Sequence, residues 1–265
     1  MNIFMREIKA NRKSLIIWCI GVIFMIISSM GKYAGMSSSG QSMNELMASM
    51  PKSLQVIMGT GAFDLSKASG YYGTIFLYLL LMATIHAVMI GANIVSKEER
   101  DHTAEFLFVK PISRKNIITF KLAAALLQII VFNVITLISS ILAVAKYSSG
   151  EKVTDDITLL MLAMFILQLL FMVIGSAMAA VMKNPKSSTA HSTGLLLITF
   201  ILSITIDLNR NLASLNYFTP FKYFEAKNIM YGGGFDIPFV ILSLVLIATL
   251  STITYVFFQK RDLYV

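Results

Sequence analysis

Six long apolar runs constrain this chain more than any other feature of its sequence. They lie at about residues 15–33, 71–95, 117–145, 157–182, 187–208 and 237–258. A helix that crosses the hydrocarbon core of a bilayer needs roughly 20 mostly apolar residues, and each run is close to that length or exceeds it. The sequence therefore predicts an all-α integral membrane protein with six transmembrane helices.

The overall composition argues against a soluble protein. Hydrophobic residues make up 56% of the chain and charged residues only 14%, with a mean hydropathy of +0.74. A soluble domain carries roughly a quarter charged residues, because its surface must meet water. Six spans of roughly 20 residues occupy about half of the chain, which leaves no room for a separate soluble domain of ordinary size. We interpret residues 1–265 as a single transmembrane domain.

The distribution of Lys and Arg predicts the orientation of the spans. With six spans, both termini share one side with the second and fourth loops, and this side holds fourteen of the 22 basic residues. Basic residues near span ends favour the cytoplasm, so both termini are predicted to be cytoplasmic. The net charge of +8 is spread between apolar runs and does not gather on one soluble face. It therefore indicates anionic lipid headgroups, and no nucleic acid, as the partner.

Three segments outside the spans have recognisable patterns. Residues 2–14 alternate apolar and basic positions as an amphipathic helix in the inner membrane surface does, and its basic residues are Arg6, Lys9, Arg12 and Lys13. Residues 31–70 contain two apolar pieces that predict short helices. Residues 209–236 hold six aromatic residues between Tyr217 and Tyr231, which predicts a re-entrant or interfacial aromatic hairpin before the last span.

Catalytic motifs are missing from the sequence. It has no HExxH, no GxSxG, and no Cys and His pair at metal-ligand spacing. It also lacks the GxxxxGK[ST] loop, whose backbone N–H groups cradle nucleotide phosphates. The one cysteine, Cys19, lies within the first apolar run, where packing is its ordinary role. The chain is thus predicted to be no enzyme and to bind no cofactor itself.

Polar side chains inside apolar runs are costly in lipid and each requires a reason. The two interpretations are hydrogen bonds between helices and the lining of a polar substrate path. The candidates for both are His86, Asn93, Asn133, Gln168 and Asp207. A proton relay would need acidic groups near the middle of the membrane, and the sequence has none there.

The loop between the second and third runs is the most informative segment. Its sequence from Ser96 to Ala124 is SKEERDHTAEFLFVKPISRKNIITFKLAA. Periodicity predicts a short amphipathic helix in this loop, which Pro111 ends because proline disfavours helix in the residue before it. Ser113 then follows as the cap of the next helix. A solvated loop is the plain alternative, but a charged helix with an apolar stripe is better explained as a docking surface for a soluble partner.

This loop resembles the first cytoplasmic loop of permease subunits of type-2 ATP-binding-cassette (ABC) transporters. The residues that carry the resemblance are Glu98, Glu99, Arg100, Thr103, Glu105, Phe106, Leu107, Lys110, Pro111, Ile112, Ser113 and Arg114. The basic start of the chain, GAFDLS at Gly61–Ser66, TPFKYF at Thr219–Phe224 and KRD at Lys260–Asp262 are similar as well. His102 departs from the glycine that is common there, which leaves the start of the loop helix open.

The resemblance implies a six-span permease domain that pairs with a second permease copy or a homologue and sits on two separately encoded ABC ATPase subunits. It implies that the loop from Glu98 to Arg114 is a coupling helix that docks on the ATPase, and that the 2–14 helix flanks this dock. ATP and Mg²⁺ would be bound by the partner ATPase. It also implies a bacterial plasma membrane location and export of amphipathic substrates such as lipids, drugs or antimicrobial peptides.

Two other classes of protein compete with this interpretation. An ion-coupled secondary transporter acting without an ATPase would show inverted repeats and interrupted helices with acidic groups near the midplane. A membrane-embedded enzyme would need a nucleophile with a base, or a set of metal ligands. The sequence shows neither pattern, and it does not identify the substrate.

Overall fold

Six long helices form the protein, as the apolar runs predict. The computed structural model describes residues 3–38, 43–60, 63–101, 103, 112–148 and 153–260. Within these ranges, six helices are long and apolar enough to cross a membrane. They are α1 (Ile3–Ser38), α4 (Ala68–Arg100), α6 (Arg114–Ala145), α7 (Thr154–Val181), α8 (Ser188–Leu208) and α10 (Ile237–Lys260). The fold is therefore an all-α integral membrane protein.

Shorter helices connect the long ones at one end. The two apolar pieces of the first connection form α2 (Met43–Ala48) and α3 (Lys52–Ile57), so the predicted short helices are confirmed. Before the last span lie two 3₁₀ helices, η1 (Arg210–Phe218) and η2 (Pro220–Lys222), and then α9 (Ala226–Tyr231). Pro220 suits the first position of η2, because its missing N–H would have no helical partner there.

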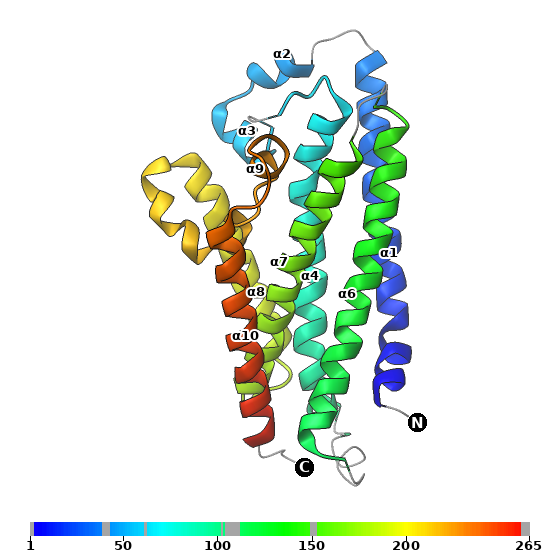
Figure 1. Cartoon of the computed structure of the whole chain (residues 1–265), viewed down its shortest axis with the longest axis vertical. Helices are drawn as coiled ribbons and strands as arrows, with labels where there is room; N and C mark the ends of the chain where they lie inside the picture. Colours follow the sequence, from blue (N-terminus) through cyan, green and yellow to red (C-terminus); the bar gives the residue numbers. More distant parts are fainter. Residues whose placement is uncertain are drawn as a thin grey trace.

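The long helices stand side by side as one upright bundle (Figure 1). We call the end that holds the start of α1 and the end of α10 the basal end, and the opposite end the distal end. The end of α4 and the start of α6 also lie at the basal end, whereas α2, α3 and α9 lie at the distal end (Figure 1). This arrangement puts the start of α1, the end of α10 and the two helix ends that flank the coupling-loop motif at one end of the bundle.

Helices α4 and α7 form the centre of the bundle. They pack backbone to backbone, because a Cβ atom at Gly91 would lie 2.1 Å from the carbonyl oxygen of Met172, and one at Gly175 would lie 2.3 Å from that of Val88. Small residues allow this close approach between membrane helices. Phe76, Leu79, Leu167 and Phe171 fill the surrounding core.

The outer helices expose apolar side chains, as expected where the solvent is lipid. Helix α1 exposes Phe24 and Ile17, and helix α10 exposes Ile241 and Leu244. A soluble monomer rarely exposes so large an apolar surface to water, and such a surface marks a site of contact with a protein or a membrane. The outer helices thus give the bundle an apolar exterior.

Helix α1 differs from the prediction at its start. The sequence predicts a separate amphipathic helix over 2–14, but residues 3–14 continue directly into the span as one helix of 36 residues. Gly21 is its first glycine, and the segment has no proline to break it. Ile3 and Glu7 are buried in the bundle, so the first turns of α1 pack against neighbouring helices.

Ring contacts attach the aromatic hairpin, residues 209–236, to the long helices. Phe221 packs against Phe171 of α7 and Phe200 of α8, with ring centres 5.3 and 5.2 Å apart. Tyr223 stacks on Phe239 at the start of α10, with ring centres 4.9 Å apart. Phe221, Tyr223 and Phe224 are buried, while Tyr217, Phe218 and Tyr231 are exposed. The hairpin packs against α7, α8 and α10. Its place relative to the bilayer stays a prediction.

Candidate functional site

A buried ion pair joins α4 to α6 at the basal end. Lys121 is fully buried in α6, and its ammonium group donates to a carboxylate oxygen of Glu98 in the last turn of α4. The same ammonium group donates to the carbonyl oxygen of Ile94 at 2.6 Å. Glu98 is therefore directed into the bundle, although the sequence places it in an exposed docking loop.

Helix α1 joins the same cluster through two adjacent residues. Arg6 donates to the second carboxylate oxygen of Glu98 at 2.8 Å and to Glu7 at 3.3 Å. Glu7 is fully buried and accepts from Lys97, the residue before Glu98 in α4. We call these five residues, Arg6, Glu7, Lys97, Glu98 and Lys121, the basal charge cluster.

The basal charge cluster connects three spans, and it tolerates the loss of one member less well than a surface pair would. Exposed ion pairs contribute little because water screens them. A buried charge has lost its water, so removing its partner leaves a charge without compensation and costs about 3–5 kcal/mol. The cluster thus specifies one relative placement of α1, α4 and α6, directly beside the coupling-loop motif.

A second contact joins the end of α4 to α8. Arg100 donates from its guanidinium group to the side-chain oxygen of Asn93 at 2.8 Å and to Asp101 at 3.0 Å. The same oxygen of Asn93 accepts from the hydroxyl group of Thr189 in α8 at 3.1 Å. Asn93, a predicted pathway or interhelical residue, therefore makes an interhelical hydrogen bond.

Only part of the predicted coupling helix can be placed. Glu105, Phe106, Leu107 and Pro111 lie outside the described residues, as does His102. Helix α4 runs to Arg100, so Glu98, Glu99 and Arg100 belong to its last turn. The backbone N–H of Thr103 donates to the carbonyl oxygen of Glu98 at 2.8 Å. Thr103 therefore lies close to the last turn of α4.

The far side of the loop is anchored as predicted. The hydroxyl group of Ser113 accepts from the backbone N–H of Asn116 at 3.3 Å, so the predicted cap of α6 is confirmed. Arg114 donates to the carbonyl oxygen of Gln259 at 3.0 Å and connects the start of α6 to the end of α10. Both ends of the loop are therefore fixed to long helices.

The four basic residues of the first segment separate into two groups. Arg6 belongs to the basal charge cluster, whereas Lys9, Arg12 and Lys13 are exposed on the outer face of α1. Exposed basic side chains near a span end suit anionic lipid headgroups. The sequence grouped all four together because helical periodicity alone does not tell which face meets another helix.

The remaining polar residues of the spans have distinct surroundings. The amide nitrogen of Asn133 donates to Gln168 at 3.1 Å and to the carbonyl oxygen of Met161 at 3.2 Å, which joins α6 to α7. Asp207 accepts from Lys222 of η2, which also donates to Glu225, so these three residues form two ion pairs at the distal end. Asn133, Gln168 and Asp207 thus connect elements of the fold.

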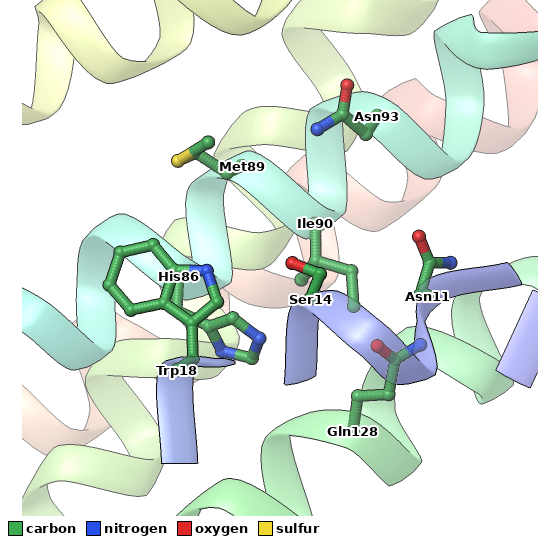
Figure 2. A pocket seen from close by; sticks show the side chains of 8 residues that line it. All are labelled: Asn11, Ser14, Trp18, His86, Met89, Ile90, Asn93 and Gln128. Atoms are coloured by element: carbon green, nitrogen blue, oxygen red, sulfur yellow. The ribbon is translucent and has the colours of Figure 1, made fainter. Parts of the chain in front are cut away.

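His86 has no such partner. It is buried between α1, α4 and α6, and its Nδ1 makes no hydrogen bond. Its ring lies between Trp18 and Phe132, with ring centres 5.6 and 5.1 Å away. It faces a cavity of about 40 Å³ (Figure 2), which is lined by Asn11, Ser14, Trp18, His86, Met89, Ile90, Asn93 and Gln128.

Sequence reasoning missed three members of the basal charge cluster. Lys97 and Lys121 contribute only to the orientation signal and Glu7 is not singled out, yet Lys97 pairs with Glu7, and Glu7 and Lys121 are fully buried. A usable signal was present, because a lysine four residues inside an apolar run requires a buried carboxylate partner. Within the described ranges, no three His, Cys, Asp or Glu side chains gather closely enough to hold a metal ion.

The fold and the basal charge cluster define a multi-pass α-helical membrane protein whose spans are braced next to a charged loop. The family model described as ABC-2 family transporter protein matches residues 1–263, and the chain belongs to this family. It is therefore an ABC transporter permease, the membrane component that works with ABC ATPase subunits. No curated protein matches the chain.

Proposed function

We propose that this chain is the permease subunit of an ATP-driven exporter and that its basal end receives motion from a separate ATPase. The observation that carries this proposal is the ion pair between Glu98 and Lys121. It fixes the two helices that enter and leave the coupling-loop motif to one another, and Arg6 adds α1 to the same unit. A force on the loop would then move three spans together.

The coupling role divides between two sets of residues. Glu98 and Arg100 have partners inside the bundle, so they position the loop. The docking contacts would come from the loop itself, where the motif supplies Glu105, Phe106, Leu107 and Pro111, and from Glu99, Thr103, Ser113 and Arg114 at its two ends. The exposed Lys9, Arg12 and Lys13 would lie beside this dock, next to the inner headgroups.

The complete transporter would contain two ATPase subunits and two permease subunits, the second being another copy of this chain or a homologue. ATP and Mg²⁺ would bind to the ATPases, and closure of the ATPase pair would rock the spans as rigid bodies. The basal end would face the cytoplasm of a bacterial cell, because basic residues dominate the segments at that end. The aromatic hairpin would help to close the distal end of the path.

The substrate would be amphipathic and would leave the cell through this path. This direction and substrate class follow the family expectation. The apolar exterior supports access from the bilayer, and the polar residues around His86 give the interior a place for a headgroup. An ion-coupled transporter is less well supported, since the sequence has no Asp or Glu near the middle of any span.

Charge reversal in the loop tests the docking role. The permease is expressed together with an ABC ATPase encoded beside it, and co-purification and ATP hydrolysis are measured in nanodiscs. We expect Glu105→Lys to abolish ATPase association while membrane insertion stays normal. Asp155→Lys, a charge reversal on an exposed residue at the distal start of α7, is the matched control and should leave association intact.

Two results would contradict the proposal. One is undiminished association and coupled transport by Glu105→Lys. The other is substrate transport by the reconstituted chain with an ion gradient and no ATPase, which would favour the ion-coupled alternative.

A further inference from the structure

The cavity beside His86 has the features of a binding site. Its wall contains a buried imidazole whose Nδ1 lacks a partner, and a buried polar atom without a hydrogen bond is rare enough to require an explanation. The rim residue Ser14 is exposed and Asn11 is part-exposed. The cavity therefore reaches the surface of the bundle beside α1.

The cavity offers both acceptors and donors. The side-chain oxygen of Asn93 already accepts from Arg100 and Thr189, so its NH₂ group remains as a donor. The amide nitrogen of Gln128 donates to the carbonyl oxygen of Ala124 at 3.3 Å, and that of Asn11 donates to the carbonyl oxygen of Glu7 at 3.1 Å. Because a carbonyl oxygen only accepts, the NH₂ groups must point toward it, and the amide oxygens remain for another partner. Figure 2 shows the oxygen of Gln128 on the side of its amide that faces the imidazole of His86.

The imidazole of His86 limits which chemical groups can bind in the cavity. A neutral imidazole offers one donor and one acceptor, so a group that both donates and accepts can satisfy His86 in either tautomer. A hydroxyl group does so, whereas a carboxylate only accepts and an ammonium group only donates. A volume of about 40 Å³ suits a group of this size, since one water molecule occupies about 30 Å³ in the liquid.

The neighbouring charges disfavour a cationic headgroup. The basal charge cluster joins three cationic side chains to two carboxylates, which leaves one net positive charge. It lies one helical turn from the cavity, because Asn11 follows Glu7 by four residues. An ammonium group in the cavity would be repelled by this charge, and a carboxylate would face the unpaired amide oxygens.

We propose that the cavity binds the uncharged hydroxyl headgroup of a membrane-borne amphiphile, taken from the inner leaflet between α1 and α4. The apolar tail would lie along the apolar surface of the bundle near Trp18 and Met89. This proposal rests on the proposed transport function, for which it names the substrate class and the access site.

Trp18 allows the site to be tested directly, because it is the only tryptophan of the chain and lines the cavity. The full-length permease in nanodiscs, without ATPase, is titrated with three dodecyl probes. Each probe carries a bromine atom on its fourth carbon, and bromine quenches indole fluorescence on contact. The probes differ only in their headgroup, which is a hydroxyl, an ammonium or a carboxylate group. We expect the hydroxyl probe to quench Trp18 saturably, whereas the other two should give only the unsaturable quenching that comes from partitioning into lipid.

Two variants test the acceptors separately. His86→Phe keeps the ring between Trp18 and Phe132 but removes the nitrogen atoms, and Gln128→Leu removes the amide. Each should weaken saturable binding by about 10-fold, the effect of a lost hydrogen bond to a buried group. His191→Phe, which alters an exposed histidine of α8, is the matched control and should bind as the wild type does.

The outcomes separate this inference from the proposed function. A cavity that holds water alone would give no saturable quenching by any probe and would overturn the proposal, as would equal binding by all three headgroups or unchanged binding in both variants. Saturable binding without stimulation of ATP hydrolysis in the assembled complex would overturn the substrate role. Association with the ATPase is measured independently, so it can fail or succeed without regard to this site.

Discussion

Lys121 of α6 and Glu98 of α4 form an ion pair inside the basal end of the bundle, with Lys121 fully buried. Glu98 also accepts from Arg6 of α1. The carboxylate of Glu98, a residue of the loop motif, thus connects three spans, and the loop begins directly after α4. This relationship gives the first of four predictions.

Removing the lysine should destabilise the protein more than removing an exposed one. Lys121→Met leaves Glu98 buried with only Arg6 beside it, at a cost of about 3 kcal/mol, which corresponds to a drop of roughly 10 °C in apparent Tm. Lys115→Met, at an exposed position in the first turn of α6, should change the apparent Tm little. The measurement is thermal unfolding in nanodiscs followed by loss of the monodisperse peak.

A double variant checks the reason for that loss. Glu98→Leu combined with Lys121→Met removes both charges, so it should recover at least half of the stability lost in Lys121→Met. A double variant as unstable as the sum of both single variants would contradict the ion-pair explanation.

Contact between α4 and α7 should not tolerate a methyl group. In Gly91→Ala the new Cβ would lie 2.1 Å from the carbonyl oxygen of Met172, and in Gly175→Ala 2.3 Å from that of Val88. Backbone atoms cannot move aside as a side chain can, so each change should cost about 3 kcal/mol or more. Yield and apparent Tm measure the loss.

Gly194→Ala supplies the control for this contact. Gly194 lies within α8, and nothing is within 4 Å of a Cβ atom built there. Alanine also favours helix over glycine, so this variant should be at least as stable as the wild type. Equal losses at Gly91, Gly175 and Gly194 would show that the tight approach of α4 and α7 has no energetic role.

Acid should loosen the distal end near α2. The hydrogen bonds that the Asp64 carboxylate accepts from the Ser66 hydroxyl group, the Asn44 amide and the Ser66 backbone N–H lower its pKa from the ordinary value of 3.8. A lowered pKa means that these bonds stabilise the folded state above pH 3.8 and are lost as the pH falls through the lower, folded value. The stabilisation is therefore fully present at pH 7.

Hydrogen exchange of the α2 amides measures this effect, with Asp64→Asn compared with the wild type at each pH. The variant should exchange faster at neutral pH, and the difference should disappear in strong acid, below the folded pKa. A difference that persists unchanged to the lowest pH would contradict the assignment to the carboxylate.

Cysteine labelling should place the basal end inside the cell. Cys19 is buried, so Cys19→Ser gives a background without cysteine. In that background Thr103→Cys should react with a membrane-impermeant maleimide only after the cells are opened, and Ser49→Cys, at the exposed distal end, should react on intact cells. The reverse pattern would overturn the orientation and, with it, docking of a cytoplasmic ATPase at the loop.

The sequence by itself determined the number of spans, the short helices α2 and α3, and the cap at Ser113. These features depend on neighbours along the chain: hydropathy adds up over about 20 residues, and a cap needs only the next turn. The loop motif likewise pointed to the ABC permease class, to which the family match over residues 1–263 assigns the chain.

Only the tertiary structure decided which charges turn inward and which polar residues meet. Glu98 and Lys121 are 23 residues apart, and Arg6 lies a further 92 residues from Glu98, so their meeting depends on how α1, α4 and α6 are rotated against each other. The same holds for Asn133 with Gln168, and for the unpaired Nδ1 of His86 at its cavity. Helical periodicity gives the face of each residue, but the neighbour that covers that face is set by packing between helices.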